Sequence, residues 1–381
     1  MATITYLTTI QFDFGAVRCI SEELKALGIQ RPLMVTDKGI VNSGILDRVS
    51  HSLGVVFSPE RVFADTPPNP TEAAVKLAAT RFLEQDCDGV IAVGGGSSID
   101  LAKGVALHVT HAPPFAQYAA ILGGLAKITA SVAPVIAIPT TAGTGSEVGR
   151  AALITLDDGR KLGFISPHLI PKRAICDPEL TLGLPPLLTA ATGMDALTHC
   201  IETFLSPRIN PPADAIALDG AARAFTWIDR AVQHGDDREA RWQMMMASLQ
   251  GGLTFQKGLG AVHSMSHPLG GLKEPVLHHG TLNAVILPSV LSFNEGFVGD
   301  KYEKLKAALG LAGSDLLPEF IEGLNKRIGL PGSLREMGLP PDAIPRLAEA
   351  AVLDHSTATN PKPADASDFE RLFRQAWEGV H

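Results

Sequence analysis

The chain changes character near its middle, and this change constrains the fold more than any other feature. Before residue 184, short apolar runs rich in β-branched residues alternate with helical patterns, as in Pro32–Asp37, Thr71–Gln85 and Gly89–Val93. Strands that alternate with helices are typical of parallel βαβ units. Two more strands are expected at Pro134–Ile138 and Ala174–Cys176. Their apolar character predicts a sheet that is buried on both faces.

After Leu184-Pro185-Pro186 the chain is rich in alanine and leucine and is interrupted by Pro and Gly rather than by strand-like runs. Apolar residues at three-to-four spacing predict helices at Leu187–Phe204, Ala213–Val232, Ala240–Phe255, Gly280–Asn294 and Asp368–Glu378. A chain of 381 residues also exceeds what one hydrophobic core usually serves. We therefore predict an α/β domain over residues 1–184 and an all-helical domain over residues 185–381.

Charge and composition narrow the range of partners. The net charge of −8, from 32 basic and 40 acidic residues, argues against nucleic acid or an anionic membrane surface. No apolar segment reaches the length of a membrane span, and the N-terminus shows no signal-peptide pattern. The four cysteines are far apart and form no C-x-x-C pair, as in proteins of a reducing compartment. We expect a cytoplasmic protein with a small-molecule ligand.

A glycine-rich loop, Gly94-Gly95-Gly96-Ser97-Ser98, lies between a predicted strand and a helical pattern. Glycines let the backbone approach a ligand closely, and the free N–H groups of a helix start attract phosphate. The alternative is a tight strand-to-helix turn. Asp37, after an earlier strand, could accept hydrogen bonds from a ribose and repel a 2′-phosphate, although such a residue is often only a turn residue.

A second loop, Pro139–Glu147, also follows an apolar strand and places hydroxyl groups among glycines. Its hydroxyls and free amides could hold a second part of a nucleotide cofactor. The alternative is a surface loop rich in serine and threonine. Two such loops in one chain support each other, and together they favour a dinucleotide ligand.

Carboxylate and imidazole groups recur at helical spacing in the second half. Asp195 and His199 are four residues apart, and so are His263 and His267, while His278 and His279 are adjacent. One carboxylate and three imidazoles suit Fe²⁺ or Zn²⁺. A surface Asp–His pair and a core histidine are the alternatives. Because Pro268 disfavours helical geometry, His263 and His267 are expected to diverge, one toward a metal and one toward a substrate.

In its ordered series of motifs the sequence resembles the iron-containing, group III alcohol dehydrogenases. The motifs are GGGSSIDLAK at 94–103, TTAGTGSE at 140–147, DPELT at 177–181, LTAATGMDALTH at 188–199, VHSMSHPLGG at 262–271 and HHG at 278–280. The resemblance covers almost the whole chain. It implies a Rossmann-like, parallel-sheet dinucleotide-binding domain, a helical metal-binding domain with the active site in the cleft between them, and a homodimer or larger homo-oligomer.

The resemblance also implies roles for individual residues. The implied metal ligands are Asp195, His199, His263 and His279, with His267 beside nicotinamide and substrate. Gly95, Gly96 and Ser97 would hold the pyrophosphate of NAD. The other positions implied to line the cofactor site are Asp37, Asn69, Asp100, Thr140, Thr141, Thr144 and Lys161.

Two departures from the family pattern concern the site. EPVLHHG contains an insertion of two residues, so His278 competes with His279, and we choose His279 because the family's last ligand directly precedes Gly. TFQKGLG replaces an asparagine-rich stretch and brings Lys257 near the expected substrate pocket. Lys257, or Arg150, could pair with a substrate carboxylate, while a surface lysine is the alternative.

The resemblance implies hydride transfer between NAD(H) and a small primary alcohol or aldehyde, with the metal acting as Lewis acid and His267 as proton relay. The segments TFQKGLGAVH and LHHGTLNAV resemble the branch that contains 4-hydroxybutyrate dehydrogenases, which implies 4-hydroxybutyrate and succinate semialdehyde as substrates. The alternatives are a maleylacetate-type reductase, a dehydroquinate-synthase-like lyase of the same fold, and a non-catalytic nucleotide- or metal-binding protein. The intact Asp-His-His-His set favours the alcohol dehydrogenase.

Overall fold

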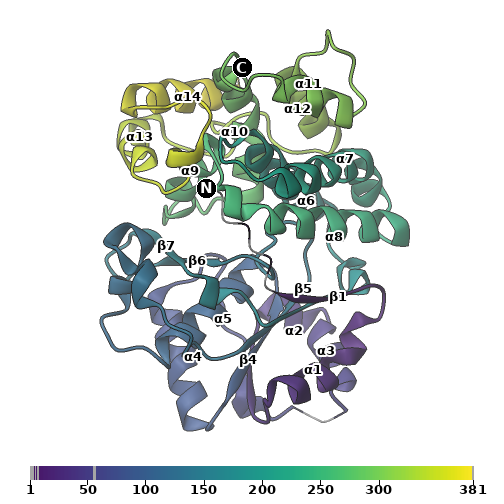
Figure 1. Ribbon diagram of the computed structural model, residues 1–381, viewed down its shortest axis with the longest axis vertical. Coiled ribbons are helices and arrows are strands. Elements are labelled where there is room, and N and C mark those ends of the chain that lie inside the picture. The colour runs from purple at the N-terminus through teal and green to yellow at the C-terminus, as the bar shows by residue number, and fades with distance from the viewer. Residues whose placement is uncertain (1–3, 5, 7, 55–56, 380–381) are drawn as a thin grey trace. The chain divides into compact units, whose positions relative to one another are not determined.

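The computed structural model describes residues 4, 6, 8–54 and 57–379 (Figure 1). By their internal contacts these residues form two compact units. The first, called here the α/β unit, contains residues 6–141 and 146–183. The second, the helical unit, contains residues 142–145 and the chain from 184 onward. The α/β plus all-α fold class expected from the sequence is confirmed.

The α/β unit is built on a parallel sheet with the strand order β1-β8-β5-β4-β2-β3. In that order the strands are Thr9–Phe12, Arg173–Cys176, Val135–Pro139, Gly89–Gly94, Pro32–Val35 and Val62–Phe63. All neighbouring pairs are parallel. The predicted strands β2, β4, β5 and β8 are therefore present, while the short edge strands β1 and β3 were not predicted.

Helices cover both faces of this sheet, which explains why its central strands are continuously apolar. Successive strand residues alternate between two cores: Val90 and Ala92 face one, whereas Ile91 and Val93 face the other. The first core includes α4 (Glu72–Glu84) and α5 (Gly96–His108), and the second includes α1 (Ile20–Leu27) and α3 (Ile45–Ser52). Figure 1 shows these two groups of helices on opposite sides of β4.

The order of the strands reverses between β2 and β4. From β2 the chain passes through α2 (Lys38–Asn42) and α3 to β3 on one side, and it then returns to form β4 and β5 on the other. Parallel sheets bind ligands beyond the carboxyl ends of their strands at such a reversal. Asp37 follows β2, and the glycine-rich loop follows β4, so both predicted cofactor segments lie at this point.

A small antiparallel hairpin, β6 (Ala151–Thr155) and β7 (Lys161–Ile165), completes the α/β unit. It was not predicted from the sequence. The hairpin packs against α5 through the buried side chains of Ala152 and Ile154. It therefore belongs to the same core as the glycine-rich helix start.

The helical unit contains α6 to α14 within the described residues. Their bounds are α6 Pro186–Leu205, α7 Pro211–Gln233, α8 Arg238–Leu253, α9 Ala261–Gly270, α10 His279–Asn294, α11 Lys301–Ala308, α12 Leu317–Arg327, α13 Ile344–Val352 and α14 Ala366–Glu378. The five predicted helices correspond to α6, α7, α8, α10 and α14. Helix α6 is buried from Thr189 to Leu205 and packs against α7, α8 and α10, so it forms the centre of the unit.

The expectation that Pro268 interrupts helical geometry is wrong. Helix α9 continues through Pro268 to Gly270. Proline removes one backbone hydrogen bond, but it lies in the last turn, where few residues of the helix follow it. His263 and His267 therefore stay one turn apart, with ring centroids 5.6 Å apart. Among the described residues, no helix is both long and apolar enough to cross a bilayer.

Candidate metal centre and cofactor loops

Helix α6 presents three acidic or imidazole side chains on one face. Asp195, His199 and Glu202 follow each other at spacings of four and three residues, which places them along a single stripe of an α-helix. All three are buried. Buried ionisable groups need partners, so this stripe requires matching groups on the helices that pack against α6.

Those partners come from α9 and α10. The Nε2 atoms of His199, His263 and His279 lie 3.5, 3.9 and 3.8 Å from Oδ1 of Asp195. One ligand atom from each of the four residues lies within 4.8 Å of the other three. The structure thus brings together the four residues that the family resemblance implied as metal ligands.

The geometry of this group fits a metal ion. Donors about 2.1 Å from a tetrahedral ion lie about 3.4 Å apart, close to the distances between Asp195 and the three imidazoles. One carboxylate with three imidazoles is also a donor set that Fe²⁺ and Zn²⁺ accept. The four residues, Asp195, His199, His263 and His279, are called the Asp-His cluster below.

Two of the imidazoles are oriented by hydrogen bonds from their outer nitrogens. His199 Nδ1 donates to the backbone oxygen of Gly143 at 3.2 Å, and His263 Nδ1 donates to Glu202 Oε2 at 2.5 Å. Because Nδ1 carries the proton in each case, Nε2 keeps its lone pair toward Asp195. Metal-bound histidines in proteins usually have such an outer partner.

The electrostatic environments of these two imidazoles differ. Burial lowers the pKa of His199 to about 4, although Asp195 acts in the opposite direction. Burial also lowers the pKa of His263, but the hydrogen bond and negative charge of Glu202 outweigh it, so that this pKa is raised. A neutral imidazole is the form that binds metal, and His199 is held in that form at neutral pH.

The amide of Asn283 lies among the donor atoms of the cluster. Its Nδ2 donates to Asp195 Oδ1 at 2.7 Å and lies 3.2 Å from Nε2 of both His263 and His279. The Oδ1 atom of Asn283 is buried and has no hydrogen-bond partner among the described residues. A buried polar atom of this kind calls for an additional group, so it supports an ion or a bound substrate at this position.

Packing at the start of α10 decides between the two neighbouring histidines. His279 is the first residue of the helix and belongs to the cluster, whereas His278 precedes the helix and is exposed. A Cβ on Gly280 would lie 2.2 Å from the backbone oxygen of Ala191 on α6. Only glycine allows α10 to approach α6 this closely, which explains the HHG motif.

His267 lies beside the Asp-His cluster and forms its hydrogen bond with a residue outside it. Its Nδ1 donates to Asp354 Oδ2 at 2.8 Å, and its ring stacks on those of His279 and His355 at centroid distances of 5.7 and 5.5 Å. Burial alone would raise the pKa of Asp354, but the charge and hydrogen bond of His267 and the charge of His355 lower it strongly. Asp354 thus orients His267 so that Nε2 is available beside the cluster.

Lys257 does not occupy the position expected from the sequence. Its side chain is fully buried, its Nζ forms an ion pair with Asp214 on α7, and it also donates to the backbone oxygen of Phe204 at 3.2 Å. An ammonium group with these partners is already compensated. The expectation that Lys257 faces a substrate carboxylate therefore does not fit the structure.

In the α/β unit, the glycine-rich loop and Asp37 lie side by side. Gly95 and Gly96 are the N-cap and first residue of α5, so their N–H groups belong to the helix start, a kind of position that favours anions. Gly94 has a φ of 151°, and a Cβ there would lie 2.5 Å from Ser98 Oγ. Asp37 caps α2 through Ile40 N and accepts from Ser98 Oγ at 3.3 Å.

The remaining predicted cofactor residues lie at several places. Thr140 and Thr141 follow β5 beside the glycine loop, since a Cβ on Gly95 would lie 3.3 Å from Thr141 Oγ1. Lys161 Nζ donates to Asn69 Oδ1 at 2.9 Å. Thr144 belongs to segment 142–145, which is grouped with the helical unit, whereas the other predicted cofactor residues belong to the α/β unit. Ser97 donates to the backbone oxygen of Pro68.

Asp100 has a scaffolding position. Its two oxygens accept from Ser146 Oγ at 2.6 Å and from Leu153 N at 3.0 Å, so it connects α5 to the second loop and to β6. Lys103, one turn later and fully buried, donates to Ser146 Oγ and to the backbone oxygens of Gly149 and Ala151. Sequence reasoning did not single out Lys103, although it lies within the GGGSSIDLAK motif.

Lys103 lies near a second buried ionisable group, Glu147. Burial lowers the pKa of Lys103 to about 8 and raises the pKa of Glu147 to about 7, while the attraction between the two charges opposes both shifts. Glu147 is the last residue of the second loop, and both side chains are buried. They were missed because a single sequence does not show which lysine and glutamate side chains are buried.

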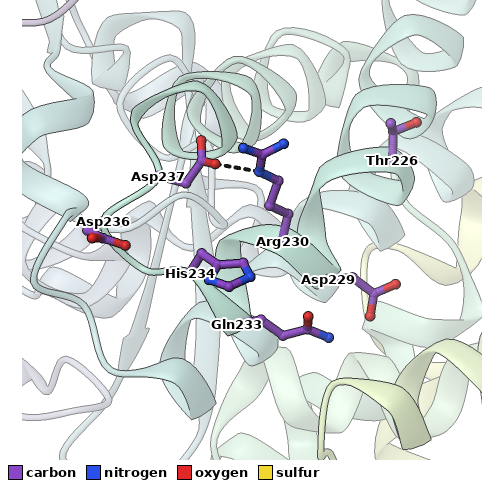
Figure 2. Close-up of a pocket in the computed structure, with 7 residues that line it drawn as sticks. All are labelled: Thr226, Asp229, Arg230, Gln233, His234, Asp236 and Asp237. Carbon is purple, nitrogen blue, oxygen red and sulfur yellow. Dashed lines mark hydrogen bonds and ion pairs between the residues drawn. The ribbon is translucent and has the colours of Figure 1, made fainter.

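The helical unit also has a surface hollow that does not include the Asp-His cluster. Figure 2 shows it at the end of α7 and the start of α8, lined by Thr226, Asp229, Arg230, Gln233, His234, Asp236 and Asp237. Arg230 pairs with Asp237 across it, and Asp229 pairs with Arg327 at 3.2 Å. The hollow contains no member of the Asp-His cluster and is a surface feature.

The α/β unit has a glycine-rich loop at the start of α5, and the helical unit has a cluster of metal-type donors. Each of these features is typical of metal-dependent dehydrogenases. Residues 8–178 match the family "Iron-containing alcohol dehydrogenase", and residues 189–377 match "Fe-containing alcohol dehydrogenase family, C-terminal". The chain belongs to the iron-containing alcohol dehydrogenase family. It is accordingly an oxidoreductase that acts on a small alcohol or aldehyde, and the family resemblance found in the sequence is confirmed.

Individual relatives are similar over their full length. A 4-hydroxybutyrate dehydrogenase from Cupriavidus necator is 54% identical over 99% of this chain and 100% of its own. The crystal structure of a 1,3-propanediol oxidoreductase is 34% identical, with a TM-score of 0.90 over 99% of this chain and 100% of that chain. A sulfoacetaldehyde reductase from Bifidobacterium kashiwanohense, solved in complex with NAD⁺, is 30% identical, with a TM-score of 0.88 over 99% and 98%.

Proposed function

We propose that this enzyme oxidises 4-hydroxybutyrate to succinate semialdehyde with NAD⁺, and catalyses the reverse reduction, with a bound Fe²⁺ or Zn²⁺. The observation that carries the metal dependence is the convergence of Asp195, His199, His263 and His279 within 4.8 Å. The substrate is proposed from the 54% identity to a 4-hydroxybutyrate dehydrogenase. Neither the family nor this relative favours a maleylacetate-type reductase or a lyase.

In this proposal the Asp-His cluster holds the metal. Gly95, Gly96 and Ser97 hold the pyrophosphate of NAD at the start of α5, and Asp37 accepts from the adenosine ribose. Asn69, Asp100, Thr140, Thr141, Thr144 and Lys161 are the further cofactor positions, with Asp100 acting through Ser146. When bound, the metal would supply Lewis acidity toward the alcohol oxygen, and NAD⁺ would supply the acceptor for the hydride of the carbinol carbon.

His267 is proposed as the proton relay for the hydroxyl proton. Its Nδ1–H is held by Asp354, so Nε2 can accept a proton on the side where the ring lies against His279. The adjacent His355 side chain is 33% exposed and stacks on His267, which gives the relay a neighbour at the solvent boundary. His267→Ala is expected to lower kcat and to change its pH profile, and an unchanged kcat at every pH would exclude the relay.

The carboxylate of 4-hydroxybutyrate requires a cationic partner. Because Lys257 already pairs with Asp214, we propose Arg150, the other cation considered from the sequence, as this partner. Arg150 is half-buried at the end of the second loop, directly before β6. A guanidinium at such a position can bind a carboxylate in two parallel hydrogen bonds.

Comparison of 4-hydroxybutyrate with butan-1-ol tests the proposal, because the two share the carbon chain and hydroxyl and differ in the carboxylate. The enzyme is assayed anaerobically with NAD⁺ and either Fe²⁺ or Zn²⁺. A charge-assisted contact predicts a kcat/KM for 4-hydroxybutyrate at least about 10-fold higher. Arg150→Ala should reduce this ratio, whereas equal or better oxidation of butan-1-ol by the wild type would exclude the proposed substrate.

Three further properties belong to the proposal. The division into domains at residues 184 and 185 is proposed from the change in sequence character described above. A homodimer or larger homo-oligomer is proposed from the family resemblance. A cytoplasmic location is proposed because the cysteines Cys19, Cys87, Cys176 and Cys200 are free thiols, as expected in a reducing compartment.

A further inference from the structure

We infer that Glu202 is a positioning residue for the metal centre, which sets the tautomer of His263 and supplies a second buried negative charge to the site. This inference rests on the proposed function, because it concerns the metal that the Asp-His cluster would hold. Glu202 belongs to none of the ligand positions implied by the sequence. It lies on α6, three residues after His199, in the centre of the helical unit.

Each carboxylate oxygen of Glu202 accepts a different hydrogen bond. Oε2 accepts from His263 Nδ1 at 2.5 Å, and Oε1 accepts from the backbone N–H of Val262 at 2.8 Å. Val262 is the second residue of α9, and its N–H therefore has no partner within the helix. A single carboxylate thus fixes both the start of α9 and the imidazole that this helix carries one residue later.

The tautomer of His263 follows from this contact. A carboxylate can only accept, so the neutral form of His263 carries its proton on Nδ1 and presents the lone pair of Nε2 toward Asp195. The opposite tautomer would carry a proton on Nε2 and could not bind a metal. Glu202 therefore selects the binding-competent form of a ligand that lies 61 positions away in the sequence.

The charge of Glu202 also matches the proposed ligand. Glu202 and Asp195 are both buried, and neither forms an ion pair with a described lysine or arginine within the salt-bridge distance. Two buried carboxylates without a permanent cation are costly, and a divalent ion would balance their two negative charges. The helix start at α9 contributes partial positive charge but no full unit.

Glu202→Gln separates positioning from helix capping. The glutamine Oε1 can still accept from Val262 N, so the helix cap is kept. The other terminal atom becomes an NH₂ donor facing His263 Nδ1, which then has to be unprotonated, and the proton moves to Nε2. We expect the metal affinity of Glu202→Gln to be about 10- to 100-fold weaker than that of the wild type.

The measurement uses the full chain, stripped of metal and titrated with Zn²⁺ in competition with a chelator, and in parallel loaded with Co²⁺ for visible absorption. Glu202→Gln should bind Zn²⁺ more weakly and show an altered Co²⁺ spectrum at saturation. If this variant does not fold, Glu202→Asp keeps the charge with a shorter reach. It should then bind Zn²⁺ more weakly than the wild type, and wild-type affinity in the folded variant would overturn the inference.

Asn360→Ala provides the matched control. Asn360 Oδ1 accepts from Ala261 N at 3.0 Å, one residue before the N–H that Glu202 caps, and it makes no contact with His263. This variant should lower Tm and leave Zn²⁺ affinity unchanged within about twofold, because the tautomer of His263 is untouched. If Asn360→Ala weakened Zn²⁺ binding as much as Glu202→Gln, loss of the helix cap would explain both.

The results for the inference and for the proposed function can be told apart. Wild-type affinity and an unchanged Co²⁺ spectrum in Glu202→Gln would overturn the role of Glu202 alone. Failure of the wild type itself to bind Zn²⁺, Co²⁺ or Fe²⁺ would overturn the metal-dependent function together with this inference.

Discussion

In the α/β unit the candidate cofactor loops use backbone amides and small side chains at the ends of neighbouring strands, whereas the helical unit gathers buried carboxylates and imidazoles from three helices. Gly95, Gly96 and Ser97 are consecutive, and their geometry depends on one turn between β4 and α5. The Asp-His cluster draws residues from α6, α9 and α10. The first arrangement is local in the sequence, and the second depends on how distant helices pack.

This difference predicts how each region responds to substitution. A site made of backbone groups keeps most of its binding when one side chain changes, because the amides remain. A site made of a few side chains loses its function when one is removed, because each donor supplies a large share of the binding free energy. The following experiments test this contrast.

The largest effect is expected for His199→Ala, which removes one of four donors from the cluster. We expect metal content to fall to a small fraction of the wild type and kcat/KM to drop by at least about 10³-fold, because the metal stabilises the transition state by several kcal/mol. Metal analysis and steady-state kinetics measure this. His234→Ala, an exposed histidine in the hollow of Figure 2, should change neither quantity. Full metal occupancy in His199→Ala would break the comparison.

Asp37→Asn should change the preference between NAD and NADP without abolishing cofactor binding. Asparagine can still cap α2 by accepting from Ile40 N, so the fold is kept, but the negative charge that repels a 2′-phosphate is lost. The ratio of kcat/KM for NADP to that for NAD should rise about 10-fold, equivalent to about 1.4 kcal/mol. Asp65→Asn, at the exposed pair with Lys38, serves as the control. An unchanged ratio of the two kcat/KM values would show that the adenosine ribose does not bind beside Asp37.

Lys257→Met tests whether a buried charged residue of the helical unit contributes to stability alone or also to substrate binding. The substitution leaves Asp214, which is 31% exposed, without its cation, so the free energy of unfolding should fall by about 1–3 kcal/mol. The preference for 4-hydroxybutyrate over butan-1-ol should not change. Urea denaturation and the two kcat/KM values measure this, with Lys304→Met at an exposed pair as control. A loss of substrate preference would indicate that Lys257 contacts the substrate.

The smallest effect concerns the pH dependence of stability in the α/β unit. The pKa of Glu147 is raised from 4.5 to about 7 in the folded protein, so between these values the folded state holds a proton that the unfolded state has released. Stability contributed by this group is therefore lost as pH rises from about 4.5 to 7. Above pH 8 the lowered pKa of Lys103 acts in the opposite direction.

Glu147→Gln removes the ionisable group and should flatten the fall in Tm between pH 5 and 7, a window taken from the pKa of about 7. Differential scanning calorimetry across this range gives the slope. The exposed variant Glu349→Gln should keep the wild-type slope. A parallel slope in Glu147→Gln and wild type would show that another group controls the titration.

The parts of the fold that were predictable are those in which local pattern and burial agree. The central strands β2, β4, β5 and β8 have continuous apolar runs because both faces are covered. Strands β1 and β3 lie at the edges of the sheet and are four and two residues long, so their pattern is weak. Helix α9 was missed because His263, His267 and two serines interrupt its apolar pattern and because a proline such as Pro268 is usually a signal for a helix end.

The candidate site divides in the same way. The motif residues could be named from the sequence, because spacing within one helix or turn reveals them. The partners could not, since Glu202, Asn283 and Asp354 are 61, 88 and 87 positions from the groups they contact. The misplacement of Lys257 has the same cause, because the carboxylate that captures it, Asp214, lies on a different helix.

The close approach at Gly280 has a consequence for attempts to change substrate scope by directed evolution. A library built around the HHG segment can vary Val276 and His278, which are exposed, without disturbing the packing of α10. Any side chain at residue 280 would push α10 away from α6 and move His279 with it. Gly280, which has no functional group, thus tolerates no side chain, and libraries should leave it out.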